Sequence, residues 1–349
     1  MDQNSWALPD PPGIEPVKGV NPWLWIVSVI LGIGIVAAAF FVPIPIFFAY
    51  LPGPVRDVEK LIEVSGARSY SSEGSLYLTT VSVDTQVTVF DMVSGLVDEE
   101  KSIVMQEEVT GSSTLEELQK EQRRQIVESK RYAQQVALSA LGLAKPHGDG
   151  ARITGILEDS PARGRLEPGD LIVSVDNDPV ETPCDVGRSV DAVDLGGEIT
   201  IIVRRDGKER TVSFKTIANP DDPTSSFLGI GMEPVNYRFD AGLKVEFATG
   251  EIAGPSAGLM FSLALYDRLT PEDLTSGRRI AGTGTIACDG GVGPIGGIEQ
   301  KVAGAQHKGA EIFLTPQANV AAARAVADDI EIVPISTFDD AVEYLEGLQ

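Results

Sequence analysis

The stretch Gly254–Gly258, which reads Gly-Pro-Ser-Ala-Gly, is followed by the apolar run Leu259–Leu265, and this combination decides the fold class. A serine between glycines at the start of a helix lies on a tight turn, where the first amides of the helix can stabilise negative charge. A serine before a helix is more often an N-cap, so this stretch alone leaves a structural role open. Ser256 is therefore a candidate nucleophile that needs a base.

The chain has few groups that could activate Ser256. A serine hydroxyl is a poor nucleophile near neutral pH without an adjacent base, yet the only histidines are His147 and His307. We expect His147 at the edge of a separate module and His307 on an outer helix face. Lys301 follows a glycine pair and lies one turn into a predicted helix. A lysine acts as a base when an apolar pocket lowers its pKa from about 10.4, whereas a solvated helix lysine has no such role.

Three short motifs follow one another in the second half of the chain. They are Gly254–Gly258, Gly282–Gly284, and Pro294–Gly297 followed by Lys301. Together they resemble the proteolytic domain of the Lon family. The resemblance implies that Ser256 is the nucleophile, that Lys301 is its base, and that Thr283 is a hydroxyl that helps to orient the lysine. We therefore expect a catalytic Ser-Lys dyad.

The resemblance to Lon continues upstream. Val127–Ser129, with Ala133 and Ala137, resembles the helix that Lon-type domains place before the strand leading to the serine, and a helix is predicted over Thr114–Leu141. No Gly-x-x-x-x-Gly-Lys-Ser/Thr phosphate loop occurs in the sequence, so we expect no ATPase, and we expect no cofactor and no metal. The expected fold class is an α/β (α+β) Lon-type domain.

A second resemblance lies between these parts. Gly150–Phe214 consists of short predicted strands with one candidate helix near Asp185–Val193. Its stretch Leu166–Asp176, in which a Gly-Asp turn leads into an alternating strand, resembles a PDZ domain, which implies a module that binds an extended peptide as an added strand. Only Leu141–Leu143 resembles the glycine-containing loop that binds the peptide carboxylate. The alternative is an unrelated small β-domain.

An uncharged stretch near the N-terminus predicts a membrane anchor. Trp23–Val42 contains no charged residue, and a helix of about 20 residues spans ~30 Å, the thickness of a hydrocarbon core. Trp23, Trp25 and Tyr50 are placed like interfacial aromatic residues. The alternative is a cleaved signal peptide with Ala37–Ala39 near its end, although no basic segment precedes it.

Composition restricts the partners. The chain has 51 acidic and 28 basic residues and a net charge of −23, with no basic block, so nucleic acid is not an expected partner. Such a charge usually reflects a soluble, self-repelling surface. Cys184 and Cys288 lie far apart, fit neither a disulfide framework nor a zinc ligand set, and leave their redox state open.

The expected architecture is an anchored enzyme with an inserted binding module. Its parts are a tail over residues 1–22, a transmembrane anchor over 23–50, Lon-like segments over 55–143 and 224–349, and a PDZ-like domain over 144–220. This arrangement resembles the membrane-anchored Lon-like PDZ peptidases of bacteria. The resemblance implies an ATP-independent serine endopeptidase for protein or peptide substrates, in a homo-oligomeric ring, commonly of six. It also implies a single-pass protein of the cell membrane with both domains on the extracytoplasmic side.

Two alternatives stay open at this point. One is a non-catalytic membrane scaffold, in which the PDZ-like groove binds a partner terminus. The other is an independent membrane-proximal domain in place of the first Lon-like segment. The sequence names neither the substrate nor the cleavage preference, and its basic residues do not settle the orientation in the membrane.

Overall fold

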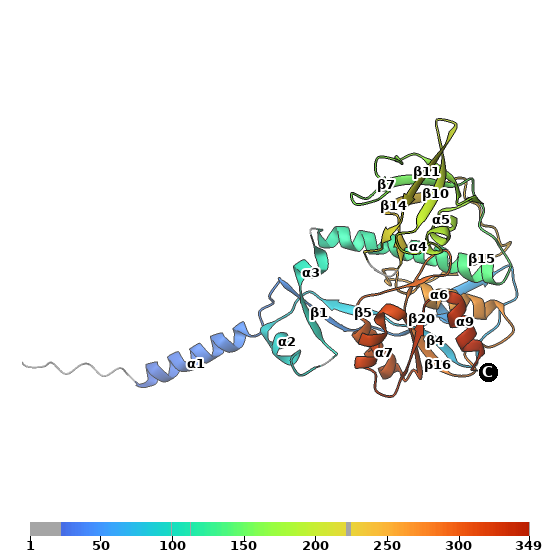
Figure 1. The fold of residues 1–349 in the computed structure, drawn as a ribbon. Helices are drawn as coiled ribbons and strands as arrows, with labels where there is room; N and C mark the ends of the chain where they lie inside the picture. The colour runs from blue at the N-terminus through green and yellow to red at the C-terminus, as the bar shows by residue number, and fades with distance from the viewer. Residues whose placement is uncertain (1–21, 99, 112, 221–224, 349) are drawn as a thin grey trace, which may run out of the picture.

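The computed structural model describes residues 22–98, 100–111, 113–220 and 225–348. The tail expected over residues 1–22 thus lies outside the described residues, apart from its last residue. The chain forms a large domain, a smaller inserted domain, and an N-terminal helix that extends away from both (Figure 1). The ends of the inserted domain meet at a bridge in which the His147 amide donates to the Arg238 carbonyl at 3.0 Å and the Arg238 amide donates back at 2.8 Å. The chain therefore leaves and re-enters the large domain at one place.

The N-terminal helix is shorter than the sequence predicts. Helix α1 spans Pro22–Ala39 and strand β1 spans Phe47–Pro52, so the anchor expected over residues 23–50 is wrong at its C-terminal end. Tyr50, expected as an interfacial aromatic residue, lies instead in β1, the central strand of a three-stranded sheet. An uncharged apolar run is compatible with a short buried strand as well as with a helix. The sequence pattern therefore does not separate α1 from β1. Among the described residues, no helix has both the length and the apolarity needed to cross a membrane.

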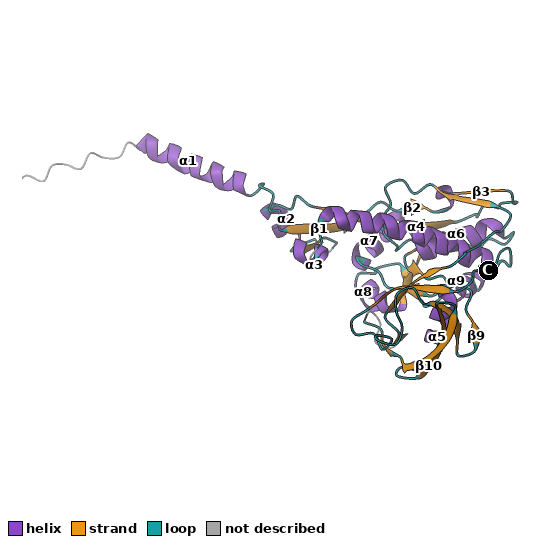
Figure 2. Cartoon of the chain, turned by 90° about the horizontal axis from the view of Figure 1, so that it is seen from above, coloured by secondary structure: helices purple, strands orange, loops and turns teal. Residues whose placement is uncertain are grey.

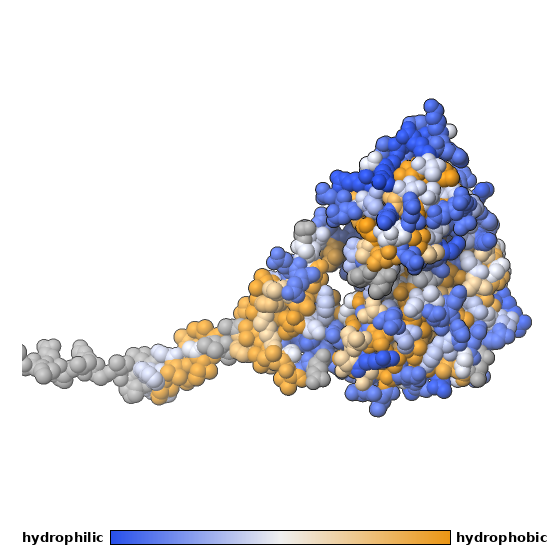
Figure 3. Space-filling view, in the orientation of Figure 1, coloured by the Kyte–Doolittle hydropathy of each residue, from blue (hydrophilic) through white to orange (hydrophobic). Residues whose placement is uncertain are grey.

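The three-stranded sheet belongs to a layer beside α1. Its elements are β1, β5 (Val81–Asp84), β6 (Ser102–Met105), α2 (Val89–Ser94) and α3 (Gln106–Thr110). The rings of Phe41 and Phe90 stack with centroids 5.8 Å apart, which joins the segment after α1 to α2. Hydrophobic side chains gather over this layer and over α1 (Figure 3), and several are largely exposed: Trp23, Ile30, Phe41, Phe90, Leu96 and Val97.

A five-stranded sheet forms the core of the large domain, in the order β2-β4-β16-β19-β20. The strands are β2 (Arg56–Asp57), β4 (Ser75–Leu78), β16 (Arg279–Gly282), β19 (Ile312–Pro316) and β20 (Glu331–Ile335). All are parallel except β2, which is antiparallel to β4. Strand β4 precedes the inserted domain and pairs with β16, which follows it, and β3 (Ile62–Ser65) likewise pairs with β15 (Lys244–Phe247). The two segments of the large domain therefore build one structure.

Two helices pack together beside this sheet (Figure 2). Helix α4 spans Leu115–Ala140 and begins at a capping box in which Thr114 and Glu117 satisfy each other's amides, as the sequence predicts. Helix α6 spans Gly258–Leu269 and is apolar on nearly every face, because it is buried among α4, the sheet and α9. The large domain also contains α7 (Ile298–Lys308), α8 (Val320–Ala325), α9 (Phe338–Glu346) and the single turns Glu59–Leu61 and Gln317–Asn319.

The inserted domain is a sheet with one helix, α5 (Pro183–Asp191). Its strand order is β11-β10-β8-β7-β14, with β9 paired to β8. The strands are β7 (Ala151–Ile156), β8 (Leu171–Val175), β9 (Asp178–Pro179), β10 (Glu198–Arg205), β11 (Lys208–Lys215) and β14 (Ile230–Pro234). Between β11 and β14 in the chain, β12 (Ile217–Ala218) and β13 (Ser226–Phe227) form a separate two-stranded sheet. The sheet extends past residue 220, where the sequence predicts the module to end, because β14 pairs with β7.

Candidate active site

Ser256 lies on a turn that leads into α6. Gly254 has a φ of 82°, in the left-handed region that favours glycine, and its amide donates to the Gln122 carbonyl at 3.0 Å. The Ser129 hydroxyl donates to the Pro255 carbonyl at 3.0 Å, so α4 holds the turn from behind. A Cβ on Gly258 would lie 2.5 Å from Cγ2 of Ile286, which leaves no room for any other residue. The glycines around Ser256 are thus required by the backbone and by close packing.

Lys301 reaches Ser256 from α7. This helix starts after Gly297, whose φ is 66°, and the lysine lies one turn further on. Its Nζ is 2.8 Å from the Ser256 Oγ and 3.0 Å from the Thr283 Oγ1. The side chain is 3 % exposed, and this burial lowers the pKa of Lys301 to about 7. The structure therefore brings together the three residues that the sequence singles out.

Thr283 fixes the lysine relative to the serine. Its hydroxyl donates to the Ser256 carbonyl at 3.0 Å, so its oxygen is left to accept an N–H of Lys301. The next amide, of Gly284, also donates to the Ser256 carbonyl, at 2.9 Å. Since Lys301 directs one N–H at Thr283, the lone pair of its neutral amine can accept the Ser256 hydroxyl proton.

Two amides beside the serine are placed to stabilise an anion. The N–H groups of Ser256 and Ala257 have no hydrogen-bond partner among the described residues, and they precede the first turn of α6. Unpaired amides at a helix N-terminus carry partial positive charge. A carbonyl oxygen held there would have its developing negative charge stabilised in an acyl-transfer reaction.

The histidines take no part in this arrangement. His147 Nδ1 lies 2.7 Å from a carboxylate oxygen of Glu181, and His307 Nε2 lies 3.0 Å from one of Glu100. Neither has a hydrogen bond to Ser256. A Ser-His pair is therefore absent from the described residues around this serine.

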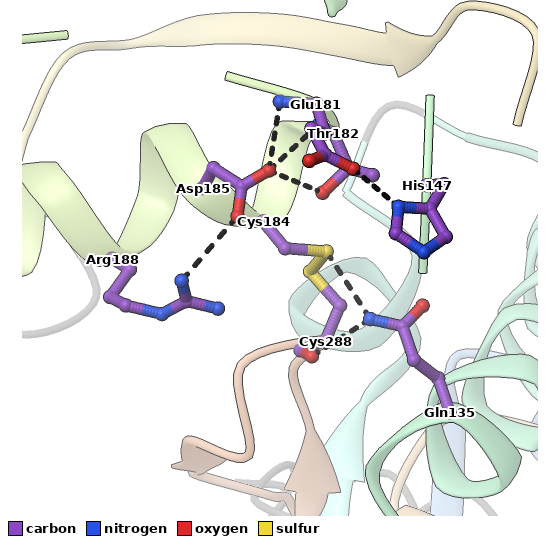
Figure 4. Close-up of polar contacts among 8 residues, drawn as sticks. All are labelled: Gln135, His147, Glu181, Thr182, Cys184, Asp185, Arg188 and Cys288. Atoms are coloured by element: carbon purple, nitrogen blue, oxygen red, sulfur yellow. Dashed lines mark hydrogen bonds and ion pairs between the residues drawn. A yellow bond between two sulfur atoms is a disulfide. The ribbon is translucent and has the colours of Figure 1, made fainter. Parts of the chain in front are cut away.

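The cysteines contradict the sequence interpretation. Cys184, at the start of α5, forms a disulfide with Cys288, in the loop between β17 (Thr285–Ile286) and β18 (Val292–Gly293) (Figure 4). The sequence left their redox state open, and the interpretation that they fit no disulfide framework was wrong because the partners lie 104 residues apart, on different domains. Two isolated cysteines carry no local signal of a contact made only in the folded chain.

The edge of the inserted sheet was also missed. Leu141–Leu143, the stretch whose sequence resembles the carboxylate-binding loop, ends α4, with the Leu143 amide donating to the Leu138 carbonyl. The edge strand is β14, which follows Gly229, a glycine with a φ of 63°. One side of β14 pairs with β7, and its other side has no partner strand in the described sheet. A glycine-containing apolar stretch therefore borders this open edge, but it comes from the C-terminal end of the inserted domain and not from Leu141–Leu143.

Comparison with known families identifies both domains. Residues 233–346 match the Lon protease (S16) C-terminal proteolytic domain, and residues 126–216 match the PDZ domain. Lon protease 2 of Bacillus subtilis is 32% identical over 117 residues, which is 33% of this chain and 20% of that protein. A Lon protease of Roseiflexus castenholzii is 37% identical over 93 residues, 26% of this chain and 11% of that protein.

A relative with a different name also matches. A probable periplasmic serine endoprotease DegP-like of Pseudomonas fluorescens is 34% identical over 84 residues, 24% of this chain and 17% of that protein. Among solved structures, the PDZ domain of an SdrC-like protein from Listeria monocytogenes is 23% identical, with a TM-score of 0.23, over 24% of this chain and 87% of that one. The chain spans no more than a fifth of the length of these curated relatives. It carries a Lon protease proteolytic domain together with a PDZ domain in one mixed α/β chain.

Proposed function

We propose that this chain is an ATP-independent serine endopeptidase that uses a Ser256–Lys301 dyad. The observation that carries the proposal is the 2.8 Å separation between Ser256 Oγ and the Nζ of a lysine that is 3 % exposed. A buried amine with a pKa near neutrality is half unprotonated at pH 7, whereas an exposed lysine is almost entirely charged. The 349 residues contain no phosphate-loop motif, and independence from ATP is part of the proposal.

The reaction follows from the site in two halves. Lys301 accepts the Ser256 proton as Oγ adds to the peptide carbonyl carbon, and the resulting oxyanion is bound by the amides of Ser256 and Ala257. The lysine ammonium then gives its proton to the leaving amine, and an acyl-serine remains. Water, deprotonated by Lys301, releases the acid. Thr283 keeps the amine directed at Oγ in both halves.

The PDZ domain supplies peptide recognition in this proposal. Its edge strand β14 can accept an extended peptide as a further strand, with side chains sorted between the two faces. The substrates are then unfolded or exposed protein segments. We include assembly into a homo-oligomeric ring, which the Lon resemblance implies, in the proposal.

We also propose that the chain is attached to a membrane, with both domains outside the cytoplasm. The exposed apolar side chains of α1 and of the layer beside it support attachment. The Cys184–Cys288 disulfide supports an oxidising compartment, because disulfides rarely persist in a reducing cytosol. The chain should fractionate with membranes and be digested by protease added to intact spheroplasts. Protection of the region after Arg56 would place the domains in the cytoplasm.

The dyad is tested by three variants of the full chain. Ser256→Ala, Lys301→Ala and the double variant should each abolish cleavage of casein and labelling by a fluorophosphonate, and to a similar extent, because the two residues act as one unit. The substitution Lys308→Ala, at an exposed position on the same helix, is the matched control and should retain activity. Near-normal turnover by either single variant would refute the dyad and favour a non-catalytic scaffold.

A further inference from the structure

The β17–β18 hairpin, residues 285–293, connects the two groups that face Ser256. It begins directly after Thr283 and Gly284, and it ends shortly before α7, which carries Lys301. Its strands also cover the nucleophile turn: Ile286 packs on Gly258, and Val292 packs on Gly284. Any displacement of this hairpin therefore moves the threonine, the lysine and the apolar cover of the serine together.

The tip of this hairpin is held from two sides. The PDZ domain holds it through the Cys184–Cys288 disulfide, which starts at the first turn of α5 (Figure 4). On the other side, backbone hydrogen bonds join the Gly290 carbonyl to the Phe338 amide and the Val292 amide to the Ser336 carbonyl, both at 2.8 Å.

Gln135 completes this joint. Its side chain is 3 % exposed, and Nε2 donates to the Cys288 carbonyl at 3.0 Å. Its Oε1 accepts the Tyr237 hydroxyl at 2.8 Å, and Tyr237 lies in the segment that returns from the PDZ domain. A buried amide with both ends bonded holds its neighbours in one arrangement. One side chain of α4 thus joins the hairpin tip to the root of the inserted domain.

We propose that Cys184, Cys288 and Gln135 are positioning residues of the peptidase, which hold the β17–β18 hairpin so that Lys301 stays shielded from water beside Ser256. The inference rests on the proposed dyad. It assigns the disulfide a role in catalysis through the hairpin, in addition to attaching the PDZ domain. In the reduced chain the hairpin tip loses its covalent link to the PDZ domain and keeps the Gln135 hydrogen bond and its contacts on the Phe338 side.

Loosening the hairpin has a pH signature. Burial alone lowers the pKa of Lys301, so water that enters beneath a loosened hairpin raises that pKa towards its ordinary value. The charged groups nearby are directed elsewhere: on α7, His307 faces Glu100 and Lys308 lies over the Tyr77 ring, and on the hairpin Asp289 faces Asp191 of the PDZ domain. A rise of about one unit cuts the neutral fraction of Lys301 about fivefold at pH 7 and hardly at all at pH 10.

The disulfide borders a cavity. Cys288 and Gln135 line a cavity of about 320 Å³ between the two domains. Dithiothreitol supplies two electrons and two protons to the sulfur–sulfur bond, leaves two cysteine thiols, and becomes its own cyclic disulfide. Titration of two free thiols per chain verifies the reduction.

The experiment compares pH profiles of Ser256 labelling in the full chain with a small fluorophosphonate, which is too small to need the PDZ groove. We expect the dithiothreitol-treated chain and the Cys184→Ser/Cys288→Ser variant to label about fivefold slower at pH 7 and at an equal rate at pH 10. Gln135→Met, which removes the hydrogen bonds and keeps the disulfide, should shift the profile in the same direction. Dithiothreitol should not change the double cysteine variant further.

A matched control lies in the same joint. His147→Gln removes the ion pair with Glu181, which does not touch the hairpin, and should leave the profile unchanged. An unshifted profile in the fully reduced chain overturns the inference. So does an equal loss of rate at every pH together with a lower melting temperature, because that marks a purely structural link. Absence of labelling in the untreated chain at all pH values instead refutes the peptidase proposal itself.

Discussion

Replacing Thr283 by valine tests the geometry of the site most directly. The side chain keeps its shape and loses only the hydroxyl, which at present lies 3.0 Å from both the Lys301 Nζ and the Ser256 carbonyl. Thr283 is 1 % exposed, so no bulk water can take over these two hydrogen bonds. The amine of Lys301 then loses the acceptor that orients it.

The expected size of the effect follows from the burial. An unsatisfied buried polar group costs about 1–3 kcal/mol. If this cost falls on the orientation of the lysine in the transition state, fluorophosphonate labelling of Ser256 slows roughly 5- to 150-fold, at about 1.4 kcal/mol per factor of ten. The variant should show this loss of rate with a cooperative melting transition still present.

Thr283→Ser is the matched control. It restores the hydroxyl with one methyl group fewer and should recover most of the labelling rate. Rates should be measured at a pH well above 7, where Lys301 is neutral in all variants, so that orientation and protonation are not confused. A valine variant that labels as fast as the wild type would show that Thr283 does not orient the lysine, and the dyad would need another support.

Three further predictions concern the protonation of Lys301, the inserted domain and a buried ion pair. Labelling of the wild type should rise with pH and reach half its maximum near pH 7, because Lys301 acts as a base only when unprotonated; a midpoint near 10 would contradict its burial. Replacing residues 148–236 by a short flexible linker, together with Cys288→Ser, should leave a folded core that still labels, as judged by melting and probe incorporation; an insoluble product would show that the host needs its insert. Asp170→Asn should lower the melting temperature of the PDZ domain, because the nearly inaccessible Asp170 carboxylate bonds to the Arg205 guanidinium, and an unchanged transition would show that the pair contributes nothing.

The closeness of Ser256, Thr283 and Lys301 was predictable because its signals are local. Ser256, Thr283 and Lys301 each sit in a glycine-bearing motif, and the three motifs occur in the order that the Lon family uses. Helix α4 was predictable for a similar reason, since Thr114 and Glu117 mark its start three residues apart. Patterns that span only a few residues can be recognised from the sequence alone.

What the sequence could not predict depends on distant contacts. The partner of Cys184 depends on how the two domains pack. The edge strand β14 pairs with β7, although the polar residues 219–226 precede it in the chain. The apolar run before Pro52 could be a helix throughout, and only its pairing with β5 and β6 makes the last part a strand. Gln135 looked like an ordinary helix residue, because its three partners lie on three other segments.

The insertion also determines the order in which the molecule can form during synthesis. Strand β4 leaves the ribosome early, yet its partner β16 follows only after the whole PDZ domain has been made. At about 5–20 residues per second, the roughly 90 residues between His147 and Arg238 delay that pairing by roughly 4–18 seconds. The strands of the PDZ sheet are separated by fewer residues than β4 and β16, so this domain can fold first. Its folding brings His147 beside Arg238 and shortens the loop that must close when the host sheet forms. Until then one edge of the apolar strand β4 has no partner, because only β2 of its two neighbours has been made. Slow or damaged folding of the PDZ domain should therefore lead to aggregation of the large domain.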